Sequence, residues 1–178
     1  MADTSYIREL IMMEKGKPTL LTPYLVSKDE NRTLARAYLG TNQTINHNTL
    51  TKVNLDTESF DVGSNFANYK YVFPVTGYYH VDFAVYLYDA DNKIELCYAT
   101  VTKSGATVCQ GSLLGFMAGG IIYRKSHGSD IVYGTAGEYL ELNALGYTTD
   151  TGTVVILGTS AGNVVSNTFM SVHLIARA

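Results

Sequence analysis

The sequence is poor in charge, in proline and in cysteine, and it contains no tryptophan. Charged residues make up 16% of the 178 residues, with 13 Lys and Arg against 16 Asp and Glu, whereas about 25% is usual in a globular domain. The near balance of signs and the formal net charge of −3 offer no basic patch or stripe for nucleic acid. We therefore expect no nucleic-acid partner, and uncharged polar side chains must cover much of the surface.

Long apolar runs are also absent, and this bears on membranes and on export. The longest uncharged stretch, residues 104–123, contains five glycines and several hydroxyl side chains, so it lacks the roughly 20 apolar residues of a membrane span. Near the N-terminus, charged residues flank a short apolar patch at 10–13, without the basic start and apolar centre of a signal peptide. The sequence predicts no membrane segment and a protein that stays in the cytoplasm where it is made.

Cysteine and histidine are too sparse to predict a disulfide framework or a metal centre. Cys97 and Cys109 are the two cysteines, too few for a disulfide scaffold and not spaced like four clustered zinc ligands, so we expect reduced, semi-buried thiols. The four histidines show neither H-x-H nor H-x-x-x-H spacing. They are His47, His80, His127 and His173. We expect no metal and no cofactor.

Charge is concentrated at the N-terminus, where residues 1–40 hold 11 of the charged side chains and the remaining 138 residues hold 18. Tyr6, Leu10 and Met13 fit a short amphipathic helix, which the Gly-Lys-Pro sequence at 16–18 would end. The residues that follow, with a proline in their middle, predict an extended arm. Such a segment has too little apolar surface to fold alone, so it stays loose or docks onto a partner.

From about residue 34 onward the pattern is typical of an all-β domain. Runs rich in Val, Ile, Tyr, Phe and Thr are separated by Gly, Asn and Asp clusters at roughly 8 to 12 residues, the spacing of a sandwich or barrel. The sequence thus predicts an arm at 1–33 and a β domain at 34–178. The clearest strand is 78–88, which alternates strictly and has aromatic side chains on both faces. We expect its second face to be covered as well, by loops or a neighbouring chain.

The remaining strands are predicted from shorter runs. After the turn cluster at 89–92, residues 94–101 predict the returning strand of a hairpin. The further predicted strands are Asp130–Tyr133, Glu138–Leu145, Thr153–Gly158 and Phe169–Ala176.

Four patches of the β region occur in a set order. The first comprises Asn42-Gln43, Ile45, Thr49–Val53 and Phe60-Asp61. The second is Phe73–Val81, in which an apolar-Pro-x-x-Gly-x-Tyr turn opens a core strand. The last two are Gly137–Leu142 and Phe169–Ile175. In this order and spacing they resemble the globular head of the complement collagen-like proteins and of tumour necrosis factor (TNF). The resemblance spans about residues 34–177, which is most of the chain.

The resemblance implies a ten-stranded, TNF-like jelly-roll sandwich that assembles as a compact homotrimer around an axis lined by aromatic and aliphatic side chains. The 14 tyrosines and the low charge agree, because they provide more apolar surface than one sandwich can bury inside. The residues expected in the core or at trimer contacts are Phe73, Tyr79, Val81, Phe83, Val85, Leu140, Leu142 and Phe169. The collagen stalk and signal peptide that are usual in secreted members are missing.

Without those features, the chain looks more like the jelly-roll proteins of bacteriophage particles, which are made in the host cytoplasm and displayed on the virion. We expect a capsid decoration or cement protein that binds the major capsid protein, or another virion protein, through its N-terminal arm. The expected anchoring residues are Tyr6, Leu10, Ile11, Leu20, Leu21 and Tyr24. The alternative is a receptor-binding knob of a phage fibre that recognises host-surface carbohydrate.

One motif resembles that of a hydrolase. Residues 158–162 read Gly-Thr-Ser-Ala-Gly, the pentapeptide that holds a nucleophilic serine between a strand and a helix. Here the following residues are not helical in character, no Asp or Glu follows Ser160, and His173 lies on a predicted strand. We therefore expect a glycine-rich turn and no enzymatic activity, with a hydrolase as a third hypothesis.

Two other groups of residues have a functional and a structural interpretation. Asp89, Asp91 and Asn92 have the oxygen ligands that calcium prefers, but they are also ordinary turn formers, the interpretation we favour. Six tyrosines could stack on sugars, although core and trimer contacts account for most tyrosines. The tyrosines concerned are Tyr69, Tyr71, Tyr86, Tyr88, Tyr98 and Tyr147.

Overall fold

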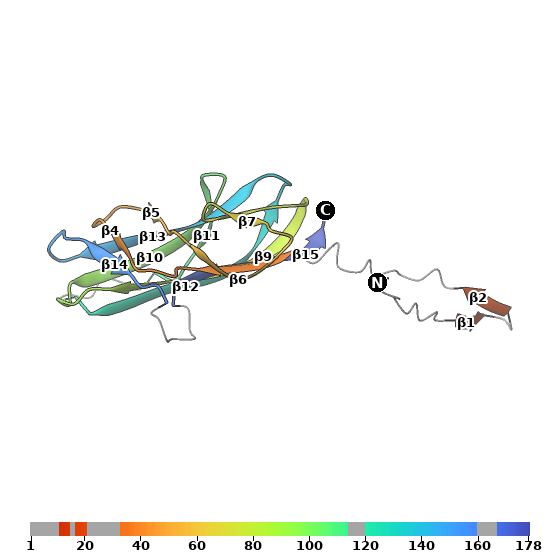
Figure 1. The fold of residues 1–178 in the computed structure, drawn as a ribbon, viewed down its shortest axis with the longest axis horizontal. Coiled ribbons are helices and arrows are strands. Elements are labelled where there is room, and N and C mark those ends of the chain that lie inside the picture. The colour runs from red at the N-terminus through yellow and green to blue at the C-terminus, as the bar shows by residue number, and fades with distance from the viewer. Residues whose placement is uncertain (1–10, 15–16, 21–32, 114–119, 160–166) are drawn as a thin grey trace, which may run out of the picture. The chain divides into compact units, whose positions relative to one another are not determined.

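The computed structural model describes residues 11–14, 17–20, 33–113, 120–159 and 167–178, and the chain divides into two compact units, 1–31 and 32–178 (Figure 1). In the first unit, strand β1 (Ile11–Glu14) pairs antiparallel with strand β2 (Lys17–Leu20).

The helix expected to run through Met13 is therefore wrong for residues 11–14. The physical reason lies partly in Pro18, which disfavours a helical conformation of Lys17 and leaves an extended segment with which β1 can pair. Among the expected anchoring residues, Ile11 and Leu20 are partners in this register. Tyr6, Leu10, Leu21 and Tyr24 lie outside the described residues.

The second unit is a sandwich of two antiparallel sheets, visible as two layers in Figure 1. One sheet has the order β11 (Ala106–Gln110), β10 (Ile94–Lys103), β13 (Tyr139–Thr148), β8 (Lys70–Val72) and β7 (Phe66–Ala67), and β5 (Thr51–Lys52) also pairs with β13. The other has the order β4 (Gln43–Ile45), β14 (Val154–Ile156), β9 (Gly77–Tyr88), β15 (Phe169–Arg177), β3 (Leu34–Tyr38) and β6 (Thr57–Val62), and β12 (Tyr123–Gly134) pairs with β9. No helix occurs in the described ranges, so the all-β sandwich prediction is confirmed.

The core lies between the two sheets and is built by strand alternation. Successive residues of a strand point to opposite faces, and on β9 the odd-numbered residues from Tyr79 to Leu87 are all buried. The expected residues in this buried cluster are Phe73, Tyr79, Val81, Phe83, Val85, Leu140 and Leu142. Phe169 lies elsewhere: it is partly exposed, and the Arg36 guanidinium carbon lies 4.5 Å from the centre of its ring.

The expected hairpin of β9 and β10 is wrong. β10 pairs with β13 and β11 in the opposite sheet. Besides its neighbours β14 and β15, β9 pairs over its whole length with β12, in an unbroken register from Tyr123 opposite Tyr88 to Gly134 opposite Gly77. Turn residues determine only that the chain reverses direction, not which strand becomes the neighbour. Because β9 and β10 each have an apolar face to bury, the connection between them crosses from one sheet to the other and both faces line the core.

Candidate functional site

The outward face of β9, β12 and β15 is unusually aromatic. We call this set of outward side chains the aromatic face; its large members are Tyr78, His80, Tyr86, Tyr88, Tyr123, Ile131, Tyr133, Phe169 and His173. Tyr78 and Tyr133 are cross-strand partners with ring centres 5.3 Å apart, and Tyr86 stacks on Tyr123 at 5.6 Å. Ile131 is 59% exposed and Tyr78 and Tyr123 are each 48% exposed. Large apolar groups in register on one face usually mark an interaction surface.

Two histidines lie side by side within this face. His80 of β9 is the register partner of His173 of β15, and the ring centres are 4.9 Å apart. On the other side of His80, its Nε2 lies 2.8 Å from Ser129 Oγ of β12. The pKa of His173 lies below its ordinary value, first because burial disfavours the charged ring and second because of His80. The aromatic face thus contains a pair of imidazole rings on adjacent strands.

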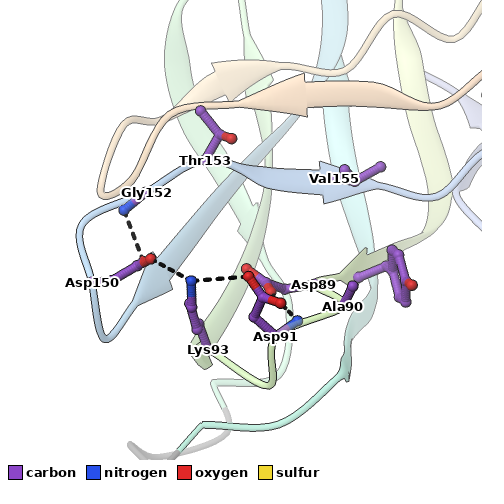
Figure 2. Close-up of a pocket in the computed structure, with 9 residues that line it drawn as sticks. Asp89, Ala90, Asp91, Lys93, Asp150, Gly152, Thr153 and Val155 are labelled. Atoms are coloured by element: carbon purple, nitrogen blue, oxygen red, sulfur yellow. Dashed lines mark hydrogen bonds and ion pairs between the residues drawn. The ribbon is translucent and has the colours of Figure 1, made fainter.

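A pocket of about 410 Å³ lies at the end of the sandwich where β9 ends (Figure 2). It is lined by Tyr88, Asp89, Ala90, Asp91, Lys93, Asp150, Gly152, Thr153 and Val155. The first five come from the end of β9 and the connection to β10, and the others from the connection between β13 and β14 and from β14. Tyr88 and Val155 are register partners, so the pocket has apolar side chains as well as three carboxylates.

A lysine ammonium joins the two loops of this pocket. Lys93 Nζ lies 3.0 Å from Asp91 Oδ2 and 2.8 Å from Asp150 Oδ2, and Figure 2 shows it between them. These contacts raise the pKa of Lys93 and lower the pKa of Asp150. The Asp91 amide donates to Asp89 Oδ1 at 2.8 Å, the geometry of an Asx turn. Both carboxylates considered as calcium ligands therefore already have a partner. Asp91 contacts the Lys93 ammonium, and Asp89 accepts the hydrogen bond of the turn.

No group of three His, Cys, Asp or Glu side chains suited to a metal ion occurs in the described residues. Nor is there, in that part of the chain, a helix long and apolar enough to cross a membrane.

The cysteines are free and more deeply buried than the semi-buried thiols we expected. Burial raises the pKa of Cys97 to about 12 and that of Cys109 to about 11. A thiol that remains protonated near neutral pH is a poor nucleophile. Neither cysteine is therefore suited to catalysis.

The glycine-rich motif is only partly within the described residues. Ser160 lies outside them, and the Gly158 amide donates to Asn42 Oδ1 at 2.9 Å. His173, the histidine that a triad would require, lies against His80 on the aromatic face.

The tyrosines considered for sugar binding lie in different environments. Tyr71 is fully buried in the core, whereas Tyr69 is 40% exposed with Lys52 Nζ 5.7 Å from its ring centre. Tyr147 contacts His47, with ring centres 4.3 Å apart. Tyr86 and Tyr88 lie on the aromatic face, and Tyr98 is partly buried on β10. Only Tyr88 of the six lines the pocket.

Sequence reasoning missed the histidine pair and the Lys93 bridge. His80 and His173 are 93 positions apart, and only the strand order places β15 beside β9. The available signal was weak: each histidine occupies the polar phase of an alternating strand.

Comparison with known proteins shows similarity at the level of the fold. No protein-family model matches the chain, and no curated protein matches it either. Among solved structures, Eiger TNF from S. frugiperda is similar with a TM-score of 0.57 and 15% identity, over 83% of this chain and 95% of that one. Murine APRIL at pH 5.0 has a TM-score of 0.58 and 10% identity, over 82% of this chain and 100% of that one.

The globular domain of zebrafish complement 1qA is similar with a TM-score of 0.51 and 10% identity, over 82% of this chain and 99% of that one. The TNF-like jelly-roll expected from the four sequence patches is thereby confirmed as the fold.

Proposed function

We propose that this protein is a homotrimeric structural protein of a virus particle, a capsid decoration protein without enzymatic activity. The observation that carries the proposal is the aromatic face. Its tyrosines and Ile131 lie in register on adjacent strands and expose large apolar area, and burying such area against sister subunits releases roughly 25 cal/mol per Å². A TNF-like jelly-roll with this face is suited to assembly around a common axis.

The N-terminal unit supplies the attachment in this proposal. Residues 1–31 are a different compact unit from the jelly-roll, and a trimer has three such units. Three weak attachments to the major capsid protein gain strength from their high effective concentration, with no new contact required. Because the trimer binds the assembled capsid, its binding shifts the equilibrium towards the assembled shell.

The first experiment measures the mass of the full chain by light scattering coupled to gel filtration. We expect a trimer, and we expect Ile131→Asp to shift it to monomer, because the substitution places a charge in the aromatic face. Leu50→Asp is the matched control, since Leu50 is also exposed, at 46%, but lies outside that face. A monomeric wild type would overturn the proposal, and a trimeric Ile131→Asp would exclude this face as the interface.

The second experiment tests the attachment. Truncation of residues 1–27 should leave the trimer intact and abolish its binding to capsids that lack the protein. Undiminished binding by the truncated trimer would disprove the anchoring role.

The pocket favours a second candidate, a receptor-binding knob that recognises carbohydrate. Tyr88 offers an aromatic ring beside carboxylates that accept hydrogen bonds from hydroxyl groups. Binding of the trimer to a glycan panel, and its loss in a Tyr88→Leu variant that light scattering shows to be still trimeric, would support this function. Tyr69→Leu, at an exposed tyrosine outside the pocket, is the control. Binding to host cells but not to capsids would favour the knob over decoration.

A further inference from the structure

The histidine pair occupies the row of the aromatic face next to that of Tyr78 and Tyr133. His80 and His173 form one cross-strand row, in which His80 also faces Ile131 of β12 and His173 also faces Leu34 of β3. The row therefore has Leu34 and Ile131 at its ends and the two imidazole rings between them. Ser129 Oγ holds His80 Nε2 at 2.8 Å, which fixes the orientation of that ring.

The charged and titratable neighbours of the pair come from β9, β12 and β3. By register and alternation they are Tyr78 and Asp82 on β9, Lys125, His127 and Tyr133 on β12, and Arg36 on β3. Asp82 is the one carboxylate among them, and its cross-strand partners are Ser129 and Ser171. Neither histidine has a carboxylate as its register partner.

The two rings influence each other when they are charged. A second positive charge beside the first is unfavourable, and removal of water from around both rings makes it more so. Even in the single chain, burial and then His80 hold the pKa of His173 below its ordinary value. Covering the row with a second copy of the chain would lower it further.

Assembly is therefore linked to proton release. A group whose pKa is lower in the trimer than in the free subunit must release its proton on assembly. Assembly therefore has its full strength above the free-subunit pKa and loses strength as the pH falls below it, by at most about tenfold in the association constant per pH unit for each histidine that must lose a proton. Each trimer contains three copies of the pair.

We propose that the His80–His173 pair makes self-assembly pH-dependent, so that the trimer is held together near neutral pH and releases its subunits as the medium is acidified towards about pH 5. This inference rests on the proposed function, because it requires that the aromatic face be covered by a second copy. A second copy of the chain suits this row, because the row has apolar side chains at its ends and no carboxylate among its register partners.

The experiment measures the mass of the full chain by sedimentation at pH 7.5 and pH 5.0 over a range of protein concentrations. Wild type should be trimeric at pH 7.5 and dissociate at pH 5.0, with circular dichroism showing a folded β protein at both. His80→Gln with His173→Gln removes both ionisations while keeping polar side chains of similar size, so it should stay trimeric at both pH values. His127→Gln is the matched control and should behave as wild type, because His127 faces Ala84 and not another histidine.

The outcomes separate the two proposals. A wild type that is trimeric at both pH values would overturn the pH switch but not the proposed trimer. Acid dissociation that persists in the double variant would have the same consequence. If His127→Gln alone abolished dissociation at pH 5.0, the His80–His173 pair would likewise be rejected as the switch. A monomer at every pH would overturn the proposed function and this inference together.

Discussion

Individual side chains of β9 show how strictly alternation divides buried from exposed chemistry. Tyr79 is fully buried, and its hydroxyl donates to the Val75 carbonyl at 2.7 Å. Its neighbour Tyr78 points to the opposite face and is about half exposed. Both are tyrosines in one strand, yet only Tyr79 depends on a hydrogen bond made away from water.

This difference predicts unequal effects of removing the two hydroxyl groups. Tyr79→Phe should lower the free energy of unfolding by about 1 kcal/mol, since the buried hydrogen bond to Val75 is lost. Tyr78→Phe should leave it nearly unchanged. Urea denaturation of both variants measures the effect, and equal losses would show that the buried bond contributes nothing specific.

The cysteines make a second prediction, which depends on pH. Because burial raises the pKa of Cys109 to about 11 and of Cys97 to about 12, both remain protonated thiols at pH 8. A colorimetric disulfide reagent should react with neither in the folded protein and with both in guanidinium chloride. Rapid labelling under native conditions would contradict the burial of the thiols.

Among the elements, the connection from β10 to β11 has the most demanding backbone. Only Ser104 and Gly105 separate the paired residues Lys103 and Ala106, and both have positive φ, 47° and 93°. Two positive φ values define the type I′ turn, in which asparagine followed by glycine is preferred. Serine is therefore an unfavourable choice at the first position.

Ser104→Asn should stabilise the domain by a few tenths of a kcal/mol, because asparagine tolerates the left-handed conformation better. Gly105→Ala should destabilise it by about 1 kcal/mol through backbone strain alone, since a Cβ at that position would meet nothing within 4 Å. Thermal unfolding of the two variants checks both signs, and a stabilising Gly105→Ala would refute the turn assignment.

The loops around Lys93 make a prediction about calcium. Because the Lys93 ammonium lies between Asp91 and Asp150, millimolar calcium should leave the Tm of wild type unchanged. In Lys93→Gln the carboxylates lose this counter-charge, so the variant should have a lower Tm in low salt and regain part of it when calcium is added. A calcium-dependent Tm in wild type would show that the lysine does not fill this role.

At the scale of the whole molecule, the boundary between the two units gives the last prediction. A chain that begins at Arg32 retains the Thr33 carbonyl, which accepts a hydrogen bond from the Leu174 amide at 3.0 Å. It should unfold cooperatively at nearly the Tm of the full chain. A chain that begins at Gly40 lacks β3, which pairs with both β15 and β6, and should be strongly destabilised. A large Tm loss on removing residues 1–31 alone would mean that the jelly-roll depends on the first unit.

The sequence by itself determined the all-β class, the buried phase of β9 and the turn residues, because strand alternation and turn chemistry are local properties of the chain. The four patches extended this to the jelly-roll, which the similar structures confirm. Only the tertiary structure decided that β10 lies in the sheet opposite β9 and that β1 and β2 pair where a helix was expected. It also decided that His80 contacts His173 and that Lys93 contacts Asp150. These features depend on strand order and register over long sequence separations, and such pairings are decided by which faces are buried together.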